Sequence, residues 1–505
     1  MLLFGEKYEK YAARLFLGLM LLCLIPMIIL GFYNHPTGDD YHYGYAAMMA
    51  WKESGSIMEM LKAAVAGTAE QFQIWQGTYS AMFLMHLPPQ IFGDIFYKVY
   101  PGILLACFVT SIFYLLHSLI CTMLKAGRNA WIVTSSLVVL LCTQQVPLCG
   151  ETFYWYNGSM YYTGFLACTF WFWGALIGML AKQAMKRMVG LAILALFIAG
   201  GNYVSLLPTL IILALLICHY GYGYVKKKNP VKREFVMLLV IFFCMMVGFM
   251  ISVLAPGNAL RQATSWKISP VSAIAKSIYY SARYYIYWNG VWSVLFVIFI
   301  TPIFIHVIRN CKWKFRYPIV VCGLIFGIYC SASCPTFYAQ NNGGAARVFC
   351  MVYYLMILTQ TMVYFYGLGA LCRFLEAHKQ KWEMMEKRPV TVCWLAGMSV
   401  LLLSCLILSI CRPWKEAYVK PHSVTAIQVL TNGEAAYYEE QYQKRLSMLQ
   451  DDSVSEVIFE PYDVPESLYY YLYLGDLSQD KCADENCKIA DIYNKRSVMV
   501  APSLP

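Results

Sequence analysis

The chain has 505 residues, of which 59% are hydrophobic and only 13% are charged, and its mean hydropathy is +0.52. In soluble domains about a quarter of the residues are charged, so this composition excludes an ordinary soluble protein. A net charge of +11 would suggest a nucleic-acid partner in a soluble chain. Here the basic residues lie in short loops between apolar segments, and we therefore predict no nucleic-acid partner.

Apolar segments long enough to span a membrane recur along the chain. The first, RLFLGLMLLCLIPMIILGFY (14–33), can cross a hydrocarbon core of about 30 Å and is too long for a signal-peptide core, so we expect a retained span. The short segments on either side of GGN (200–202) predict two half-length helices or a tight pair. Hydropathy predicts about eleven spans, at residues 13–33, 95–121, 130–147, 161–181, 188–200, 203–220, 235–255, 290–308, 318–334, 348–372 and 390–411. The predicted fold class is an all-α polytopic membrane protein.

Basic residues predict the orientation of these spans. Alternate short loops, together with the N-terminal segment, hold most of the lysines and arginines, which favours the cytoplasm for the N-terminus. An odd number of spans then places the C-terminal tail outside the plasma membrane. The loops with unusual composition all fall on the external side: GDDYHYGY (38–45), ETFYWYNGSMYY (151–162), GGNYVS (200–205), APGNALRQ (255–262) and PTFYAQNNGGAARVF (335–349).

Two external segments, 34–94 and 256–289, are too polar to span, and we expect amphipathic helices there that lie in the membrane interface. The chain from residue 412 onward is polar and acidic. In it, TAIQVL (425–430) and SEVIFEPY (455–462) predict strands on either side of a helix at 434–450. We therefore predict a transmembrane domain over 1–411 and a small extracytoplasmic α/β domain over 412–505.

Cysteine usage adds one open question about the tail. Most of the 19 cysteines lie in apolar spans, where cysteine acts as a small hydrophobic residue. Cys482 and Cys487 are the two in the polar tail, and they predict either a disulfide or two free thiols.

Asp39 and Asp40 are adjacent carboxylates directly after the first span. Neighbouring acids repel, which raises the pKa of at least one of them. The pair is suited to supply a general base for a hydroxyl, or half of a site for Mg²⁺ or Mn²⁺. The alternative is that both acids favour the N-terminus of an interfacial helix. His42 beside them is a candidate partner or ligand.

Arg261 and Arg347 follow glycine- and asparagine-containing turns on the same side. A guanidinium group binds phosphate oxygens in a bidentate manner, so both are candidate phosphate ligands, and pairing with headgroups or acids is the alternative. Glu151 is predicted to bind sugar hydroxyls or to orient a partner, and the alternative is a structural acid among tyrosines. The aromatic residues around these acids, including Trp75, Tyr154 and Trp155, suit an interfacial belt or stacking on a sugar ring.

Other motifs carry less information. The triplet NGS (157–159) matches a glycosylation acceptor, a short pattern that often arises by chance. The sequence has no zinc-type His/Cys spacing, no phosphate-binding loop and no dinucleotide fingerprint.

In their order along the chain, these features resemble the C-type membrane glycosyltransferases (GT-C). The acidic pair in the first external loop, the interfacial helices, the eleven spans and the external C-terminal domain carry this resemblance. More narrowly, nearly the whole chain is similar to an uncharacterised family of Gram-positive bacterial membrane proteins placed within that superfamily. The similar motifs are DDYHY (39–43), WQGTYSA (75–81), ETFYWYNG (151–158), APGN..R (255–261) and LYLGDLSQD…ADIYNKRSVMV (472–500).

The resemblance implies a GT-C-like catalytic domain over 1–411 and an inverting transfer from a polyprenyl-phosphate sugar, such as an undecaprenyl-phosphate sugar. The acceptor is expected to be an extracytoplasmic cell-envelope glycan. Asp39 or Asp40 would be the general base, and the other would orient it or bind a divalent cation. Arg261 and Arg347 would neutralise the donor phosphate. The remaining expected substrate-binding residues are Glu151, His42, Trp75, Gln76, Tyr154, Trp155, Asn202 and Asn258.

The sequence departs from the expected family pattern at Thr78, where a basic residue is expected, and in GGNYVS, which lacks an acid. Two other function classes also stay open. A transporter or flippase for lipid-linked glycans predicts charged residues deep within the spans. An inactive scaffold of a polysaccharide-assembly complex would need neither the base nor the phosphate ligands.

Overall fold

The computed structural model describes residues 6–182, 185–226, 232–263, 268–377 and 420–502. These residues are mostly helical, and they include eight helices long and apolar enough to cross a membrane. The protein is thus an all-α polytopic membrane protein, which confirms the predicted class. The eight are built on α1 (Glu6–Leu30), α5 (Asp94–His117), α8 (Phe165–Lys182), α10 (Tyr203–Val225), α11 (Lys232–Val253), α14 (Val291–Asn310), α15 (Pro318–Ser331) and α17 (Ala346–Ala377).

Two other predicted spans form shorter helices. Residues 130–147 correspond to α6 (Arg128–Gln144) and residues 188–200 to α9 (Met185–Ala199), of 17 and 15 residues. The prediction of two half-length helices around Gly200 is wrong, because α10 has 23 residues. Nor do α9 and α10 form a tight pair, since α9 packs mainly against α11 and α8. The predicted span at 390–411 lies outside the described residues.

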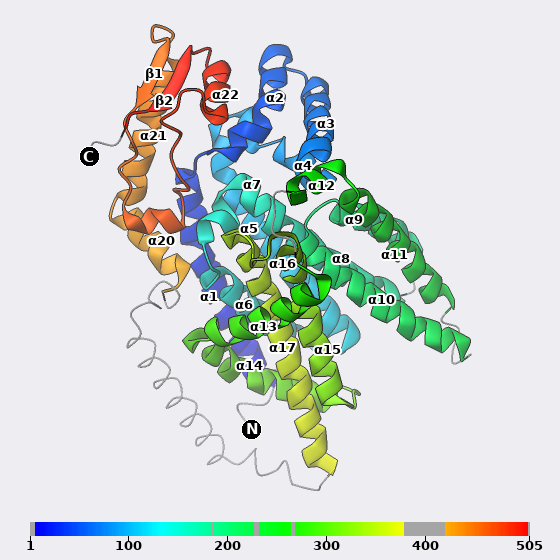
Figure 1. The fold of residues 1–505 in the computed structure, drawn as a ribbon. Helices are drawn as coiled ribbons and strands as arrows, with labels where there is room; N and C mark the ends of the chain where they lie inside the picture. The colour runs from blue at the N-terminus through cyan, green and yellow to red at the C-terminus, as the bar shows by residue number, and fades with distance from the viewer. Residues whose placement is uncertain (1–5, 183–184, 227–231, 264–267, 378–419, 503–505) are drawn as a thin grey trace.

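The helices at one end of the bundle carry a cap of short elements. Figure 1 shows α2 (Asp39–Ser54), α3 (Ile57–Ile74) and α4 (Tyr79–Met85) at the end far from the N-terminus. Gly55 ends α2 with a φ of 61°, a conformation that glycine adopts without strain. Ser56 then caps α3 by accepting from the N–H of Glu59. The other short helices are α7 (Tyr156–Ser159), α12 (Pro256–Ala263), α13 (Pro270–Tyr287) and α16 (Cys334–Gln340).

The C-terminal residues form α20 (His422–Thr431), α21 (Glu434–Gln450), β1 (Glu456–Phe459), α22 (Asp484–Ile492) and β2 (Ser497–Val500). The strands are parallel, with Glu456 opposite Ser497 and Phe459 opposite Val500. The predicted helix at 434–450 and the strand within 455–462 are confirmed. The tail cysteines are free and exposed.

The predicted strand at 425–430 is wrong, because this segment is part of α20. Ala426 and Val429, three residues apart, are buried, whereas Ile427 between them is exposed. This three-residue spacing belongs to a helix that packs against α1. The strand β2 was missed, although its buried Val498 and Val500 alternate with more exposed neighbours.

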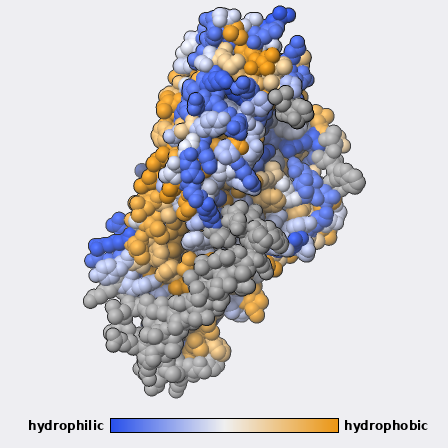
Figure 2. Space-filling view, turned by 90° about the vertical axis from the view of Figure 1, so that its left-hand side faces the viewer, coloured by the Kyte–Doolittle hydropathy of each residue, from blue (hydrophilic) through white to orange (hydrophobic). Residues whose placement is uncertain are grey.

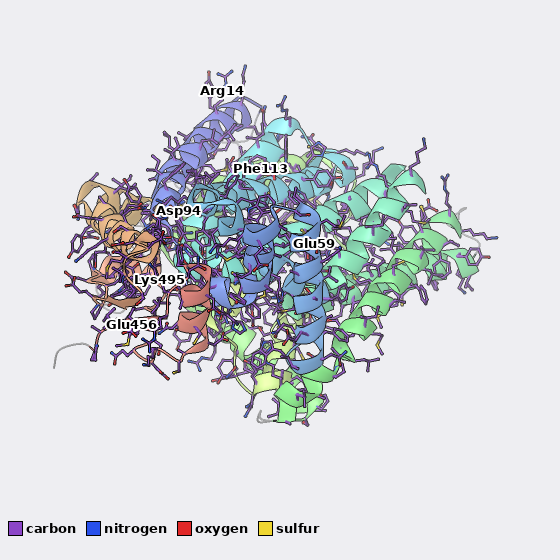
Figure 3. All side chains as sticks on the ribbon, turned by 90° about the horizontal axis from the view of Figure 1, so that it is seen from above. Arg14, Glu59, Asp94, Phe113, Glu456 and Lys495 are labelled. Atoms are coloured by element: carbon purple, nitrogen blue, oxygen red, sulfur yellow. The ribbon has the colours of Figure 1, made fainter. Side chains whose placement is uncertain are left out.

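Polar contacts attach these C-terminal elements to the transmembrane helices. Lys98 of α5 lies 2.6 Å from Glu439 of α21, and the buried His422 contacts the carbonyl oxygen of Val146 at 2.7 Å. Figure 2 shows hydrophilic residues over the upper part of this flank and hydrophobic residues below it. In Figure 3, Glu456 and Lys495 mark the C-terminal elements along one side, and Glu59 of α3 lies nearer the middle. The C-terminal residues therefore border the segment that carries the two adjacent aspartates.

Candidate functional site

A cavity of about 550 Å³ opens at the capped end of the bundle. Its walls come from the start of α2, the end of α3, α7, the start of α10, the end of α11, α12, α16 and the start of α17, so it gathers segments far apart in the sequence (Figure 1). Much of the predicted site lines it. The predicted residues in its walls are Asp39, Trp75, Gln76, Trp155, Asn202, Asn258, Arg261 and Arg347.

The two adjacent aspartates have different environments. Asp39 is exposed and lines the cavity, whereas the side chain of Asp40 is fully buried. Consecutive residues of a helix point about 100° apart, so at the start of α2 one of the two faces the cavity while the other faces the protein interior. The structure therefore brings only one of the two predicted catalytic acids to the cavity wall.

Asp40 is held by three uncharged donors. Its carboxylate accepts from the Tyr97 hydroxyl at 2.7 Å, from the Thr37 N–H at 3.1 Å and from the Asn157 N–H at 3.3 Å. The pKa of Asp40 is raised to about 7: burial and, to a smaller extent, the charge of Asp39 raise it, and the three hydrogen bonds oppose the rise. Asp40 thus fixes the start of α2 against α5 and α7.

The predicted alternative of a divalent cation held between Asp39 and Asp40 does not fit this geometry. The oxygen atoms of Asp40 already accept hydrogen bonds from three donors and lie away from the cavity. Within the described part of the chain, no three His, Cys, Asp or Glu side chains form a set that could hold a metal ion.

Arg261 is positioned by the APGN motif of α12. Its guanidinium group lies 4.6 Å from the centre of the Trp75 ring, and its Nη1 donates to Oε1 of Gln76 at 3.0 Å. Gly257 allows this close approach, because a Cβ atom there would lie 2.4 Å from the backbone nitrogen of Trp75. Asn258 ties α12 to its neighbours by accepting from the Gly77 N–H at 3.2 Å. The side chain of Asn258 therefore stabilises the site by hydrogen bonding to the backbone of neighbouring segments.

Arg347 forms the second cationic group of the cavity. Its Nη1 lies 3.3 Å from Oε2 of Glu151, and its guanidinium group lies 5.1 Å from the centre of the Trp155 ring and 5.8 Å from that of Tyr162. Glu151 does not line the cavity, and it orients Arg347. Of the predicted roles of Glu151, the contact with Arg347 fits the orientation of a partner, and that partner is an arginine.

Tyr43 lies within the electrostatic influence of all three charged groups of the cavity. The pKa of Tyr43 is raised to about 12, first by burial and then by the carboxylate of Asp39, while the charges of Arg261 and Arg347 act in the opposite direction. Tyr43 lines the same cavity as the acid and both guanidinium groups. Its hydroxyl keeps its proton near neutral pH and can donate a hydrogen bond into the cavity.

Three predicted site residues have other roles. Tyr154 is fully buried in the helical core, and its hydroxyl donates to the carbonyl oxygen of Met27 at 2.8 Å. His42 points toward the C-terminal residues, where it contacts Asp484 and lies 3.0 Å from Nζ of Lys488. Asn202 lines the cavity, but its Oδ1 caps α10 by accepting from the Val204 N–H at 2.8 Å. The structure therefore does not bring Tyr154 and His42 to the cavity, because each side chain is turned toward other elements of the protein.

Some cavity residues were missed. Asn157 lies in the motif ETFYWYNG, but the sequence indicated no role for it beyond a glycosylation pattern. Tyr203 follows the GGN turn, and Gln262 is adjacent to Arg261. The residues of α16 lie in the quoted segment 335–349, but their sequence contains no acid or base that would have marked them as lining. No known protein family matches the sequence, and no curated protein does.

Proposed function

We propose that this protein is a plasma-membrane glycosyltransferase of the GT-C type. It moves a sugar from a polyprenyl-phosphate donor to an extracytoplasmic cell-envelope glycan, with inversion at the anomeric carbon. The observation that carries the proposal is the convergence of Asp39, Arg261 and Arg347 on one cavity of about 550 Å³. That volume lies within the range of small-molecule sites, roughly 300–1,000 Å³.

The charges fit the two ends of the reaction. Arg261 and Arg347 bind the donor phosphate and neutralise the charge that grows on it as it leaves. Asp39 is the exposed carboxylate of the cavity and accepts the proton of the acceptor hydroxyl. The hydroxyl oxygen forms a bond to the anomeric carbon while the bond from that carbon to the phosphate oxygen breaks. Because attack occurs opposite the leaving phosphate, the configuration inverts.

The membrane arrangement follows from the positive-inside pattern. With the N-terminus in the cytoplasm, the cavity opens at the extracytoplasmic end, since it lies at the end of the bundle far from the N-terminus. Eleven spans, with α6 and α9 as the shorter ones and 390–411 as the last, fit this orientation. The residues from 412 onward then form an extracytoplasmic α/β domain beside the cavity.

The proposal is tested by a transfer assay with the purified full-length protein. The donor is a polyprenyl-phosphate sugar with a labelled sugar, and the acceptor is glycan prepared from the host envelope. Asp39→Asn should lower the transfer rate by about 10²–10⁴-fold, the usual contribution of a general base, and should keep donor binding. Asp452→Asn, which changes an exposed acid of the C-terminal residues, is the matched control and should leave the rate unchanged.

Two other results would contradict the proposal. Movement of the intact lipid-linked glycan across vesicles, without transfer, would identify a flippase. The protein would be a scaffold if the wild type shows neither activity and deletion of its gene still alters the envelope glycan. Equal transfer rates for Asp39→Asn and the wild type would exclude Asp39 as the base.

A further inference from the structure

Asn157 is a buried residue in the wall of the cavity. It lines the cavity wall, and only 1% of it is exposed. Its Oδ1 and Nδ2 have no hydrogen-bond partner among the described residues. A buried polar group without a hydrogen-bond partner is destabilising. The great majority of buried polar groups in proteins therefore have a partner. An unmet amide in a cavity wall therefore points to a ligand that supplies the missing hydrogen bonds.

Trp155 presents a second unmet group beside Asn157. Its Nε1 is buried without a partner in the part of the chain that the structure describes, and the residue lines the same cavity. Gly158 makes room for this ring, because a Cβ atom there would lie 2.4 Å from Cε3 of the indole. The position of the indole thus requires glycine at residue 158.

The backbone around these groups is held on several sides. The N–H of Asn157 donates to Oδ1 of Asp40 at 3.3 Å. The Tyr156 hydroxyl donates to the carbonyl oxygen of Leu84 at 2.7 Å, and Ser159 Oγ lies 2.8 Å from the hydroxyl of Tyr100. A binding group on a fixed element is precise in space, so the amide has a set position relative to the start of α2.

The chemistry of the two groups selects an uncharged, hydroxyl-bearing ligand. The amide of Asn157 offers two donor hydrogens and an acceptor oxygen, and the indole of Trp155 offers one donor. Neither group carries a charge, so a phosphate or carboxylate would bind more tightly to Arg261 or Arg347 than to these two groups. A sugar ring has neighbouring hydroxyls that both donate and accept, and it matches this set. Modification at the NGS triplet does not explain Asn157, because its Nδ2 is buried.

We propose that Asn157 and Trp155 form the sugar subsite of the cavity and determine which sugar the donor carries. The amide of Asn157 binds hydroxyls of the transferred sugar, and the indole N–H of Trp155 binds a further oxygen of the same ring. This assignment rests on the proposed glycosyltransferase function. It adds the recognition of the sugar to the phosphate contacts of Arg261 and Arg347.

The test is a binding measurement with the full-length protein in detergent. The probes are bare polyprenyl phosphate and polyprenyl phosphates that carry glucose, galactose, mannose or N-acetylglucosamine. We expect the wild type to bind at least one sugar-bearing lipid about tenfold more tightly than the bare lipid, and Asn157→Ala to lose that preference. The Kd for the bare lipid should stay unchanged. The thermal midpoint of Asn157→Ala should not fall, because the variant removes an amide that has no protein partner.

Two further variants sharpen the result. Gln90→Ala is the matched control, because the amide of Gln90 is also buried without a partner in the described residues but does not line the cavity. It should keep the sugar preference. Trp155→Phe keeps a ring beneath Arg347 and removes only the N–H, so it should weaken binding of the sugar-bearing lipid by about threefold to tenfold.

The outcomes separate the two proposals. If the wild type prefers a sugar-bearing lipid and Asn157→Ala keeps the same preference, the subsite is wrong and the glycosyltransferase proposal stands. Equal weakening of bare and sugar-bearing lipids in Asn157→Ala would also overturn the subsite. If the wild type binds bare and sugar-bearing lipids equally, the subsite is wrong, and the transfer assay decides the glycosyltransferase proposal separately.

Discussion

Asp40 beside the cavity and Glu439 at the contact with the C-terminal residues are two carboxyl groups whose pKa values shift in opposite directions. Burial raises the pKa of Glu439, but contacts with His35 at 3.2 Å and Lys98 at 2.6 Å outweigh burial and lower it to about 2. Burial also raises the pKa of Asp40, and its three uncharged donors leave it at about 7. The ammonium group of Lys98, which has no counterpart at Asp40, makes the main difference between the two sites.

The same protein thus contains one carboxyl contact that is insensitive to pH near neutrality and one that responds to it. Glu439 stays ionised over the whole physiological range, so the contact between α21 and α5 is insensitive to pH there. Asp40 changes its protonation close to neutrality, directly behind the cavity residue Asp39. We therefore expect the start of α2 to respond to pH and the C-terminal contact to resist it.

The largest expected effect concerns Asp40. Its folded-state pKa is raised from 3.8 to about 7, so the folded protein binds this proton more tightly than the unfolded chain. Its contribution to stability is complete below a pH of about 4 and is lost as the pH rises through about 7. Three pKa units correspond to about 4 kcal/mol of the free energy of unfolding. Asp40→Asn should remove this decline, as measured by thermal midpoints in detergent between about pH 5 and about pH 8. An identical pH dependence in the variant and the wild type would disprove the burial of an ionisable Asp40.

Glu439→Gln should have the next largest effect. It leaves Lys98 with Asp94 as its remaining acidic partner, at 3.1 Å. A partly buried pair lies between the surface and interior cases, so we expect a loss of about 2–3 kcal/mol in the free energy of unfolding. Because the pKa of Glu439 is lowered, this contribution is present above a pH of about 4.5 and is lost as the pH falls toward about 2. Glu440→Gln, at the exposed neighbour, is the control. Equal thermal midpoints for the two variants would show that the ion pair does not stabilise the contact.

Gly158→Ala tests the cavity side of the comparison by steric means. The added Cβ atom would lie 2.4 Å from the Trp155 ring, so the indole must move. Such overpacking typically lowers the free energy of unfolding by about 1–3 kcal/mol. We expect a value near the lower end, because the indole borders the cavity on one side and can move into it. Gly18→Ala, a helical glycine with no atom within 4 Å of the added Cβ atom, should not be destabilised. Thermal midpoints of both variants measure the difference, and equal values would mean that the position of Trp155 is not set by Gly158.

Tyr45→Phe should have the smallest effect. The Tyr45 hydroxyl donates to Asp491 at 3.1 Å between α2 and α22, but this bond is exposed to solvent. We expect a change within about 0.5 kcal/mol in the free energy of unfolding. Thermal midpoints at equal detergent concentration measure it. A loss as large as that of Glu439→Gln would show that the exposed contacts of α22, and not the buried ion pair, hold the C-terminal residues in place.

Much of the fold was predictable because long apolar segments have few alternatives to a transmembrane helix. The errors lie where local pattern and tertiary context compete. TAIQVL has strand-forming residues, yet Ala426 and Val429 pack on α1 with helical spacing. The strand β2 was missed because its valines are only a short run near the end of the chain.

The site was predictable as a set of loops, because alternate connections lie on the same side of the membrane. The orientation of single side chains was not. Whether Asp39 or Asp40 faces the cavity depends on the residue at which α2 begins, and whether Tyr154 or Trp155 does depends on the turn into α7. The position of His42 could not be predicted, because its partner Asp484 lies 442 residues away in the sequence. Asn157 could be recognised only after burial showed an amide without a partner.

The most direct test of the central claim is an experimental structure of the full-length protein with a bound polyprenyl-phosphate sugar. We predict that the phosphate lies between Arg261 and Arg347, that the sugar contacts Asn157 and Trp155, and that Asp39 faces the anomeric carbon from the side opposite the phosphate. A phosphate bound elsewhere while the cavity holds no part of the donor would contradict the proposed enzyme.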